Sequence, residues 1–146
     1  MARVDYWSIE EKISELLLDT EGLEDINVLI EEELTLQRGP TVAVYLDRRD
    51  APAGLQSASG GQRTRFEIRF SIWCYEFHLD MQTAIKLRDE LLGRVEVALI
   101  KNSTLGGTVA GAWIEGGEFQ NAKNPGGTGF FSGGEIVLVA DKVATI

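Results

Sequence analysis

The sequence predicts an α+β fold in a single domain over residues 1–146: a mainly antiparallel sheet of about five strands with two helices packed on one face. Residues 63–77 alternate apolar and polar side chains with the period of a half-buried strand. Residues 81–100 place their apolar side chains on one helical stripe. At 146 residues the chain is long enough for one domain with its own core.

The first helix is expected to begin after Ser8 and to end near Gly22. Ser8 and Glu11 have the spacing of a capping box, in which each side chain bonds the backbone amide of the other residue. The apolar side chains then recur at helical spacing, at Ile9, Ile13, Leu16 and Leu17. Gly22 is typical of a helix end.

Two short strands are expected next, at residues 26–36 and 41–47, with a turn at Gly39 and Pro40 between them. A helix over residues 29–37 is the alternative for the first of these strands. Glu31, Glu32 and Glu33 would alternate between the two faces of a strand, so they cannot form one carboxylate cluster. A solvated, acidic sheet edge is their expected role.

Residues 48–62 are predicted to form a flexible loop, because they are rich in Ala, Gly and Ser and poor in large apolar side chains. The segment is longer than a hairpin turn requires, which is typical of functional or disordered loops. It would form the tip of a hairpin between residues 41–47 and 63–77.

The strand over residues 63–77 has two unequal faces. One face carries Phe66, Ile68, Phe70, Ile72 and Cys74, which are expected to face the core. The other face is polar as far as Ser71 and then carries Trp73, Tyr75 and Phe77. Two helices can cover only one face of the sheet, so these aromatic side chains would remain partly bare. Exposed aromatic patches typically mark interfaces, here with another subunit.

Asp80 is expected to cap the main helix, which begins at Met81 and ends near Ile100. Its apolar stripe comprises Ala84, Leu87, Leu91, Val95 and Leu99. Gly93 lies inside this helix and costs about 1 kcal/mol relative to alanine. Its presence indicates either close packing or a break in the helix.

The glycine-rich C-terminal part is expected to contribute two strands, at residues 108–115 and 135–140, the second of them interior to the sheet. A second flexible loop is predicted at about residues 120–132, around the sequence NAKNPGGTG.

The composition argues against several classes of function. A formal net charge of -9 disfavours a surface that grips nucleic acid or an anionic membrane. Cys74 is the only cysteine, so no internal disulfide can form, as expected of a cytoplasmic protein. The N-terminal residues do not have a signal-peptide pattern, and no apolar run reaches the ~20 residues of a membrane helix.

The sequence contains little that suggests catalysis. Cys74 and His78 invite comparison with a cysteine–histidine pair, but on one strand they would lie about 13 Å apart, too far for a hydrogen bond. The glycine doublets match no phosphate-binding motif, and no zinc-ligand spacing occurs. Nothing points to a carboxylate-bound Mg²⁺ or Ca²⁺ ion. We therefore expect no enzyme activity, no cofactor and no metal, and a structural or interaction protein.

The layout of the whole chain resembles the tail terminator family of long-tailed bacteriophages, whose members are also called minor tail or tail completion proteins. The matching features are a capped helix, SIEEKISELLL, a strand ending in VAVYLDRRDAP, a long Gly/Ser/Ala loop, the strand RTRFEIRFSIWCYEF, the helix AIKLRDELLGRVEVAL, and a closing pair, GAWIEGGEF and GGEIVLVADK. The resemblance covers nearly the full length and lies in size, element order and loop placement.

The resemblance implies a non-enzymatic protein that forms a ring, usually of six subunits, on the growing tail tube. Such a ring stops polymerisation of the major tail tube protein, docks to the head–tail connector and lets DNA pass without specific binding. It implies a location at the head-proximal end of the virion tail, and in the host cytoplasm during assembly. An acidic lumen would repel DNA.

Our candidates for the oligomer or partner interface are Arg48, Arg49, Arg65, Arg69, Trp73 and Tyr75. Two alternatives remain open: another phage neck or head-closure component, and a small-ligand-binding α+β domain that uses the open sheet face as a pocket. The second alternative would need convergent polar groups beside Trp73.

Overall fold

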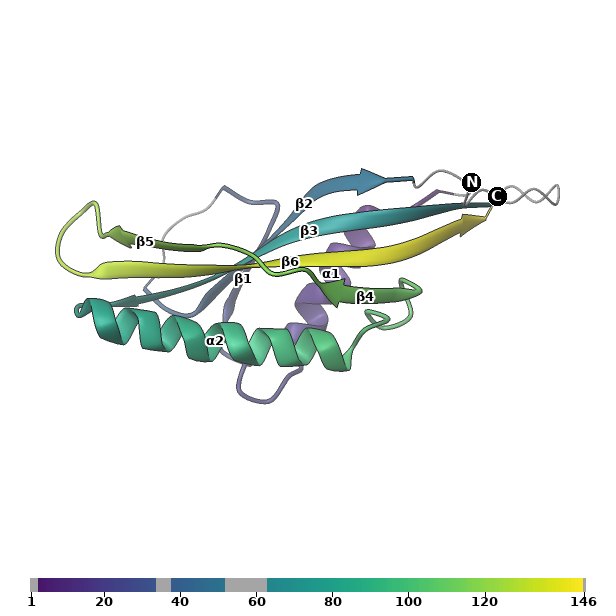
Figure 1. Ribbon diagram of the computed structural model, residues 1–146. Coiled ribbons are helices and arrows are strands. Elements are labelled where there is room, and N and C mark those ends of the chain that lie inside the picture. The colour runs from purple at the N-terminus through teal and green to yellow at the C-terminus, as the bar shows by residue number, and fades with distance from the viewer. Residues whose placement is uncertain (1–2, 34–37, 52–62, 146) are drawn as a thin grey trace.

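The computed structural model describes residues 3–33, 38–51 and 63–145 (Figure 1). The elements, in chain order, are α1 (Tyr6–Leu18), β1 (Asn27–Ile30), β2 (Thr41–Asp50), β3 (Arg63–His78), α2 (Met81–Lys101), β4 (Gly111–Ile114), β5 (Phe119–Lys123) and β6 (Phe130–Thr145). Six strands form one sheet, which confirms the predicted α+β class and adds one strand to the expected number.

The sheet has the strand order β1-β2-β3-β6-β4, and β5 also pairs with β6. All pairs are antiparallel except β1 with β2, which is parallel. β3 and β6 pair along their whole length, from Arg63 opposite Thr145 to His78 opposite Phe130. β4 and β5 share the outer edge of β6, β4 beside residues 138–141 and β5 beside residues 130–134.

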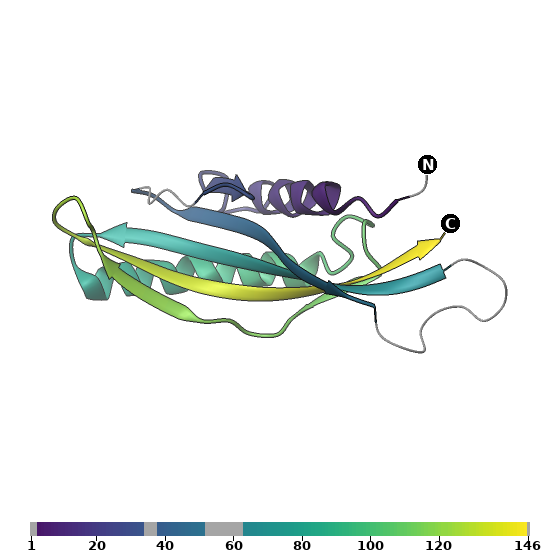
Figure 2. The same cartoon turned by 90° about the horizontal axis from the view of Figure 1, so that it is seen from above.

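Both helices contribute to one core on the same face of the sheet, as predicted. In Figure 1 α2 runs beneath β3 and β6, and in Figure 2 it lies behind them. The alternating residues of β3 that were expected to face inward do so: Ile68, Phe70, Ile72 and Cys74 are fully buried. Around them pack apolar residues of both helices and of β6, among them Ile9, Ile13, Leu17, Leu91, Val95, Leu99, Ile136 and Leu138.

The caps of the two helices differ in how well the sequence predicted them. Asp80 caps α2 as expected, and its carboxylate accepts from the Thr83 amide. The predicted cap at Ser8 is wrong: α1 begins at Tyr6, and Asp5 is its N-cap. The Asp5 carboxylate accepts from both the amide and the hydroxyl of Ser8. An aspartate is as good an N-cap as a serine, and with Asp5 as the cap the helix begins three residues earlier than a cap at Ser8 would allow.

The strands near the acidic and arginine-rich segments have different bounds from those predicted. β1 ends at Ile30 because Glu31 has a positive φ of 52°, so Glu31 lies outside a strand. Of the predicted strand at 26–36, residues 34–36 lie outside the described residues. β2 continues to Asp50 because residues 48–50 still pair with β3 beyond a bulge after Leu46. The rest of the loop predicted at 48–62 lies outside the described residues from 52 onward.

The C-terminal bounds also differ. The strand predicted at 108–115 is shorter, as β4, and the last strand is far longer than 135–140, because β6 follows β3 over its full length. The loop predicted at about 120–132 is confined to a turn between Lys123 and Phe130, because β5 and β6 pair on either side of it. Asn124 bonds Gly129 and Thr128 across that turn.

Candidate functional site

The sheet face turned away from α1 and α2, here called the open face, holds five of the six candidate interface residues. Arg65, Arg69, Trp73 and Tyr75 lie at odd-numbered positions of β3, and Arg48 pairs with Arg69 from β2. The regular alternation of the strand therefore places these side chains on one face. None of the described elements other than the sheet itself covers this face (Figures 1 and 2).

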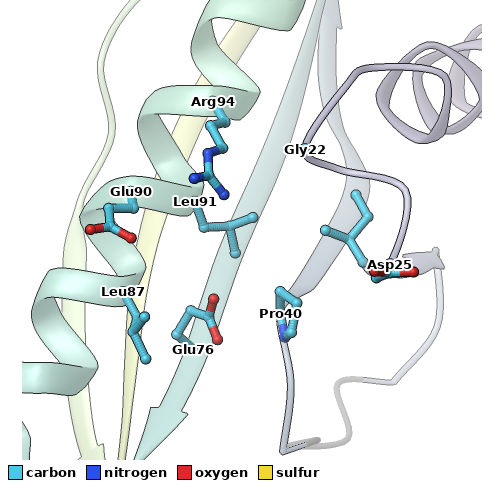
Figure 3. Close-up of a pocket in the computed structure, with 9 residues that line it drawn as sticks. Gly22, Asp25, Pro40, Glu76, Leu87, Glu90, Leu91 and Arg94 are labelled. Atoms are coloured by element: carbon cyan, nitrogen blue, oxygen red, sulfur yellow. The ribbon is translucent and has the colours of Figure 1, made fainter.

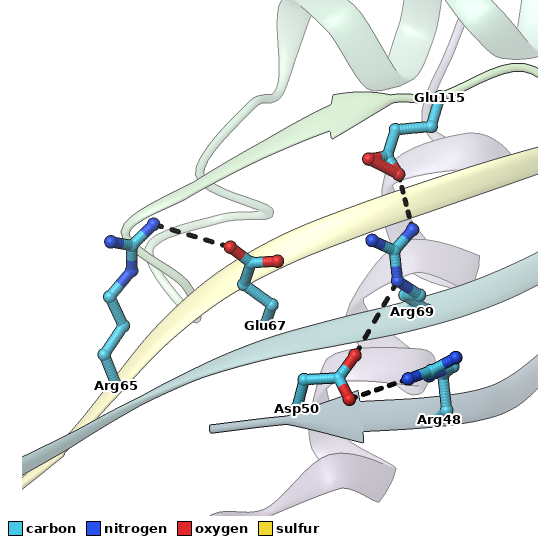
Figure 4. Close-up of polar contacts among 6 residues, drawn as sticks. All are labelled: Arg48, Asp50, Arg65, Glu67, Arg69 and Glu115. Carbon is cyan, nitrogen blue, oxygen red and sulfur yellow. Dashed lines mark hydrogen bonds and ion pairs between the residues drawn. The ribbon is translucent and has the colours of Figure 1, made fainter. Parts of the chain in front are cut away.

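One half of the open face is a network of ion pairs (Figure 4). Asp50 links two arginines: its carboxylate lies 2.8 Å from Arg48 Nη2 and 3.9 Å from Arg69 Nε. Arg69 also donates to Glu115, which follows β4. Strands β2 and β3 and the end of β4 are therefore connected by one chain of opposite charges.

Arg65 forms a second group of ion pairs nearer the chain end. Its Nε donates to Asp141 Oδ1 at 2.6 Å, and its Nη2 lies 3.9 Å from Glu67. The side chain of Arg65 is a third exposed, so solvent screens these pairs and their contribution to stability is small. They place the Arg65 guanidinium between Glu67 of β3 and Asp141 of β6.

The electrostatics of Glu115 follow from this arrangement. The hydrogen bond from Arg69 holds the pKa of Glu115 below its ordinary value, and the Arg69 charge and a hydrogen bond from Trp113 act in the same direction. Reciprocally, Glu115 raises the pKa of Arg69. Trp113 lies opposite Val139 of β6, which in turn pairs with Arg69, and it is 40% exposed, so it adds an aromatic side chain to the charged half of the open face.

The other half of the open face is aromatic. Trp73 and Tyr75 stack with ring centroids 5.8 Å apart and an interplanar angle of 20°. The Tyr75 ring covers Gly133 of β6, where an added Cβ would lie 2.6 Å from Tyr75 Cε1. Burial raises the pKa of Tyr75 to about 12, so its phenol is neutral at physiological pH. The open face thus presents a stacked aromatic pair beside a network of ion pairs.

Arg49 does not belong to this group. Register places it opposite Ile68, on the core side of β3, and its guanidinium lies over the Phe66 ring at 5.4 Å from the centroid. The adjacent arginines of the sequence therefore lie on opposite faces of the sheet. This follows from the strand character of residues 48–50, which the loop prediction did not include.

Several residues of the open face were not predicted, because they come from distant segments. Asp141 reaches Arg65 through the pairing of β6 with β3, and Glu115 and Trp113 come near Arg69 only because β4 pairs with the other edge of β6. The alternation of β6 could have signalled Asp141, since residues 135–143 place acidic and β-branched side chains at every second position. No local signal marks Glu115.

Cys74 and His78 do not form a catalytic pair. Cys74 is fully buried on the core side of β3, and this burial raises the pKa of its thiol. His78 ends the strand, and its Nδ1 accepts from the Asp80 amide at 3.0 Å. In the described part of the chain, no three His, Cys, Asp or Glu side chains are grouped as metal ligands.

A small cavity lies on the helix side, between α2, the segment 22–26 and Pro40 (Figure 3). Its polar lining includes Glu76, Glu90 and Arg94, and its volume is about 110 Å³. Burial and the neighbouring Glu90 raise the pKa of Glu76, while Arg94 lowers it. Ligand pockets typically measure ~300–1,000 Å³, so this cavity is too small for a metabolite. It also lies on the helix side of the sheet, away from Trp73.

None of the helices in the described ranges is long and apolar enough to cross a membrane.

Comparison with known proteins gives a similarity of structure. No protein-family model matches the chain. No curated protein matches it either. Among solved structures, the chain is similar to the sheath/tube terminator of an extracellular contractile injection system, PVC, in the extended state, with a TM-score of 0.52 and 16% identity. The match covers 96% of this chain and 58% of that one, so this chain spans little more than half of its structural neighbour. At this identity the similarity establishes a shared fold.

Proposed function

We propose that this protein is a tail terminator: a structural protein that caps a tail tube as a ring, stops its polymerisation and offers the surface to which the head docks. The observation that carries the proposal is the structural match to a sheath/tube terminator over 96% of the chain. The sequence resemblance to phage tail terminators supports the same role independently of the structure.

The open face supports a subunit or partner contact. It combines a stacked aromatic pair, Trp73 and Tyr75, with arginines held in place by carboxylates. Aromatic and arginine side chains are enriched at the energetic centres of protein interfaces. Oriented arginines lose less conformational freedom on binding than free ones do. We propose that this face contacts the neighbouring subunit in a ring, and that the ring in turn binds the tail tube and connector proteins.

The net negative charge is concentrated in one segment. Residues 3–33 carry eleven of the 23 acidic side chains and two of the 14 basic ones, which leaves twelve of each in the rest of the chain. A ring whose lumen is lined by this segment would let DNA pass without binding it. A ring structure with a lumen lined by Lys and Arg would contradict this part of the proposal.

The experiment is to measure molar mass by light scattering over a wide range of concentrations, with and without purified tail tubes. A closed ring, or a ring that forms only on tube ends, is the expected result. Trp73→Ala and Arg48→Glu should weaken ring formation while the monomer stays folded. Matched controls are Trp7→Ala on α1, where Trp7 is 51% exposed, and Arg49→Glu on the other face of the sheet.

Two results would contradict the assignment. Unchanged ring formation in Trp73→Ala and Arg48→Glu would remove the open face from the contact. A chain that stays monomeric and ignores tubes, but binds a purified connector, would identify a neck or head-closure component instead.

A further inference from the structure

Nothing in the described part of the chain requires a glycine at position 93. It lies in the middle of α2, which continues through it without a break. A Cβ added at Gly93 would have nothing within 4 Å. Glycine in a helix interior costs about 1 kcal/mol relative to alanine. The sequence offered two explanations for this glycine, a break in the helix or close packing, and neither is found among the described residues of the single chain.

The surface around Gly93 has the character of a contact. Exposed residues recur every fourth position along α2 and form one ridge, here called the α2 ridge: Asp89, Gly93, Val97 and Lys101. Val97 is 50% exposed and the nearby Ile100 is 65% exposed. A groove beside the α2 ridge is lined by the same four residues together with Thr20, Glu21, Glu90 and Arg94. Exposed apolar side chains and a missing side chain thus lie next to an open groove.

The order of residues along the α2 ridge is self-complementary. Read in one direction it is acidic, glycine, valine, basic, and an antiparallel copy presents basic, valine, glycine, acidic. We propose that the α2 ridge is the contact between two copies of this chain, related by a two-fold axis that passes between Gly93 and Val97. Val97 of each copy then fills the space above Gly93 of the other, and Asp89 pairs with Lys101 of the second copy.

General rules of helix packing agree with this arrangement. Ridges formed by every fourth residue are the ones that most often interdigitate between helices, and a glycine lets the two backbones approach. A two-fold contact uses the same patch on both copies, which requires the self-complementarity seen here. Of the two charged residues in the proposed pair, Asp89 already accepts from Arg88 of its own chain through Oδ1, and Lys101 is exposed at the end of α2.

The α2 ridge faces away from the sheet, so this contact is separate from the open face. It does not rest on the proposed tail function. A two-fold contact closes with two copies and does not by itself build a ring, so it describes an additional association of the chain. A single helix pair is small for an interface, so the dimer should dissociate on dilution.

The test is sedimentation equilibrium of the full chain over a wide range of concentrations. The wild-type mass should rise toward twice the monomer mass. Gly93→Leu should abolish this rise and keep the monomer folded, because position 93 is exposed and a Cβ there has nothing within 4 Å in the monomer. Lys101→Asp should weaken the dimer by roughly tenfold or more, because it places a carboxylate opposite Asp89 of the second copy in both symmetry-related pairs. The double variant that exchanges the charges, Asp89→Lys with Lys101→Asp, should restore the dimer.

Lys86→Asp is the matched control, because Lys86 is exposed on α2 in the turn before the α2 ridge begins. In the antiparallel pair the position opposite Lys86 lies beyond the end of α2. Lys86→Asp, which makes the same change of charge as Lys101→Asp, should therefore leave the dissociation of the dimer unchanged.

A cross-linking experiment gives an independent result. Chains carrying Gly93→Cys and chains carrying Val97→Cys, mixed in equal amounts and oxidised, should form mixed disulfides at well over twice the yield of either self-pair, the ratio that random pairing would give. The native Cys74 is buried and should not interfere. A wild type that stays monomeric at the highest concentration, an assembly that Gly93→Leu leaves unchanged, or a statistical distribution of disulfides would each overturn the proposal.

Discussion

The carboxyl group of Glu10 on α1 lies within hydrogen-bonding reach of that of Glu31, the residue that follows β1. Glu10 is 2% exposed, and its Oε1 has no hydrogen-bond partner among the described residues. Glu31 Oε2 accepts from the Leu46 amide of β2 at 2.5 Å. Burial, and then the hydrogen bond and charge of Glu31, raise the pKa of Glu10 to about 8. A protonated Glu10 thus joins α1 to the edge of the sheet.

The first prediction is that Glu10→Gln stabilises the protein at alkaline pH. The folded-state pKa of Glu10 lies above its unfolded value of 4.5, so the folded state binds more protons between these values and stability falls as pH rises toward about 8. The amide introduced by Glu10→Gln stays neutral and donates to Glu31 at every pH. At pH 9 the variant should be more stable than the wild type by roughly 1–3 kcal/mol, the cost of a buried group without compensation.

Urea denaturation of both proteins at pH 5, 7 and 9 measures this difference. Glu11→Gln is the control, because Glu11 lies on the exposed side of the same helix. Stability curves for the wild type and Glu10→Gln that run parallel across this range would show that Glu10 is ionised in the folded state.

The shared face of Arg69 and Trp73 was predictable because strand alternation is a local property. Once β3 is a strand with Phe70 and Cys74 inward, Arg69 and Trp73 must point outward, whatever the rest of the chain does. The same reasoning located α2, whose apolar stripe and aspartate cap lie within one continuous segment. Features encoded in neighbouring residues could therefore be predicted from the sequence.

The missed features depend on pairing between distant segments. β5 has five exposed residues and no alternation, and it is a strand only because β6 offers it a free edge. The Glu10–Glu31 contact joins residues 21 positions apart and depends on the positive φ of Glu31, which ends β1. The strand pattern predicts a solvated edge at Glu31 instead. Neither relationship leaves a periodic signal in the sequence.

A second prediction concerns the packing of Tyr75 on Gly133. An alanine at Gly133 would place its Cβ 2.6 Å from Tyr75 Cε1, so the ring would have to move away from its stacked position beside Trp73. Gly133→Ala should destabilise the protein by about 1–3 kcal/mol, the usual cost of overpacking. Thermal unfolding measures the change. Gly126→Ala is the control, because that glycine lies in a turn with nothing within 4 Å of an added Cβ. Equal effects of the two substitutions would contradict the role of Tyr75.

A third prediction tests the corrected start of α1. Asp5→Ala should lower the melting temperature by roughly 3–5 °C, because it leaves the Ser8 amide without its acceptor at the first turn. Ser8→Ala should lower it less, since the amide of residue 8 can still donate to Asp5. Thermal unfolding of the two variants distinguishes the caps. A larger loss for Ser8→Ala would restore Ser8 as the helix cap.

The last prediction concerns the charge network of the open face. Arg69 holds the pKa of Glu115 below its ordinary value by a hydrogen bond and by its charge. Arg69→Gln removes the charge, so the Glu115 pKa should rise toward 4.5. In the wild type, the stability that the pair contributes is present above pH 4.5 and is lost as the pH falls through the folded-state pKa of Glu115. In Arg69→Gln this pH-dependent contribution should disappear. Carboxyl-carbon NMR titration follows Glu115 directly. Arg65→Gln, which removes the partner of Asp141 instead, should leave the Glu115 titration unchanged. Because solvent screens the exposed pair, global stability should change little, so an altered ring assembly in Arg69→Gln would reflect the contact surface and not unfolding.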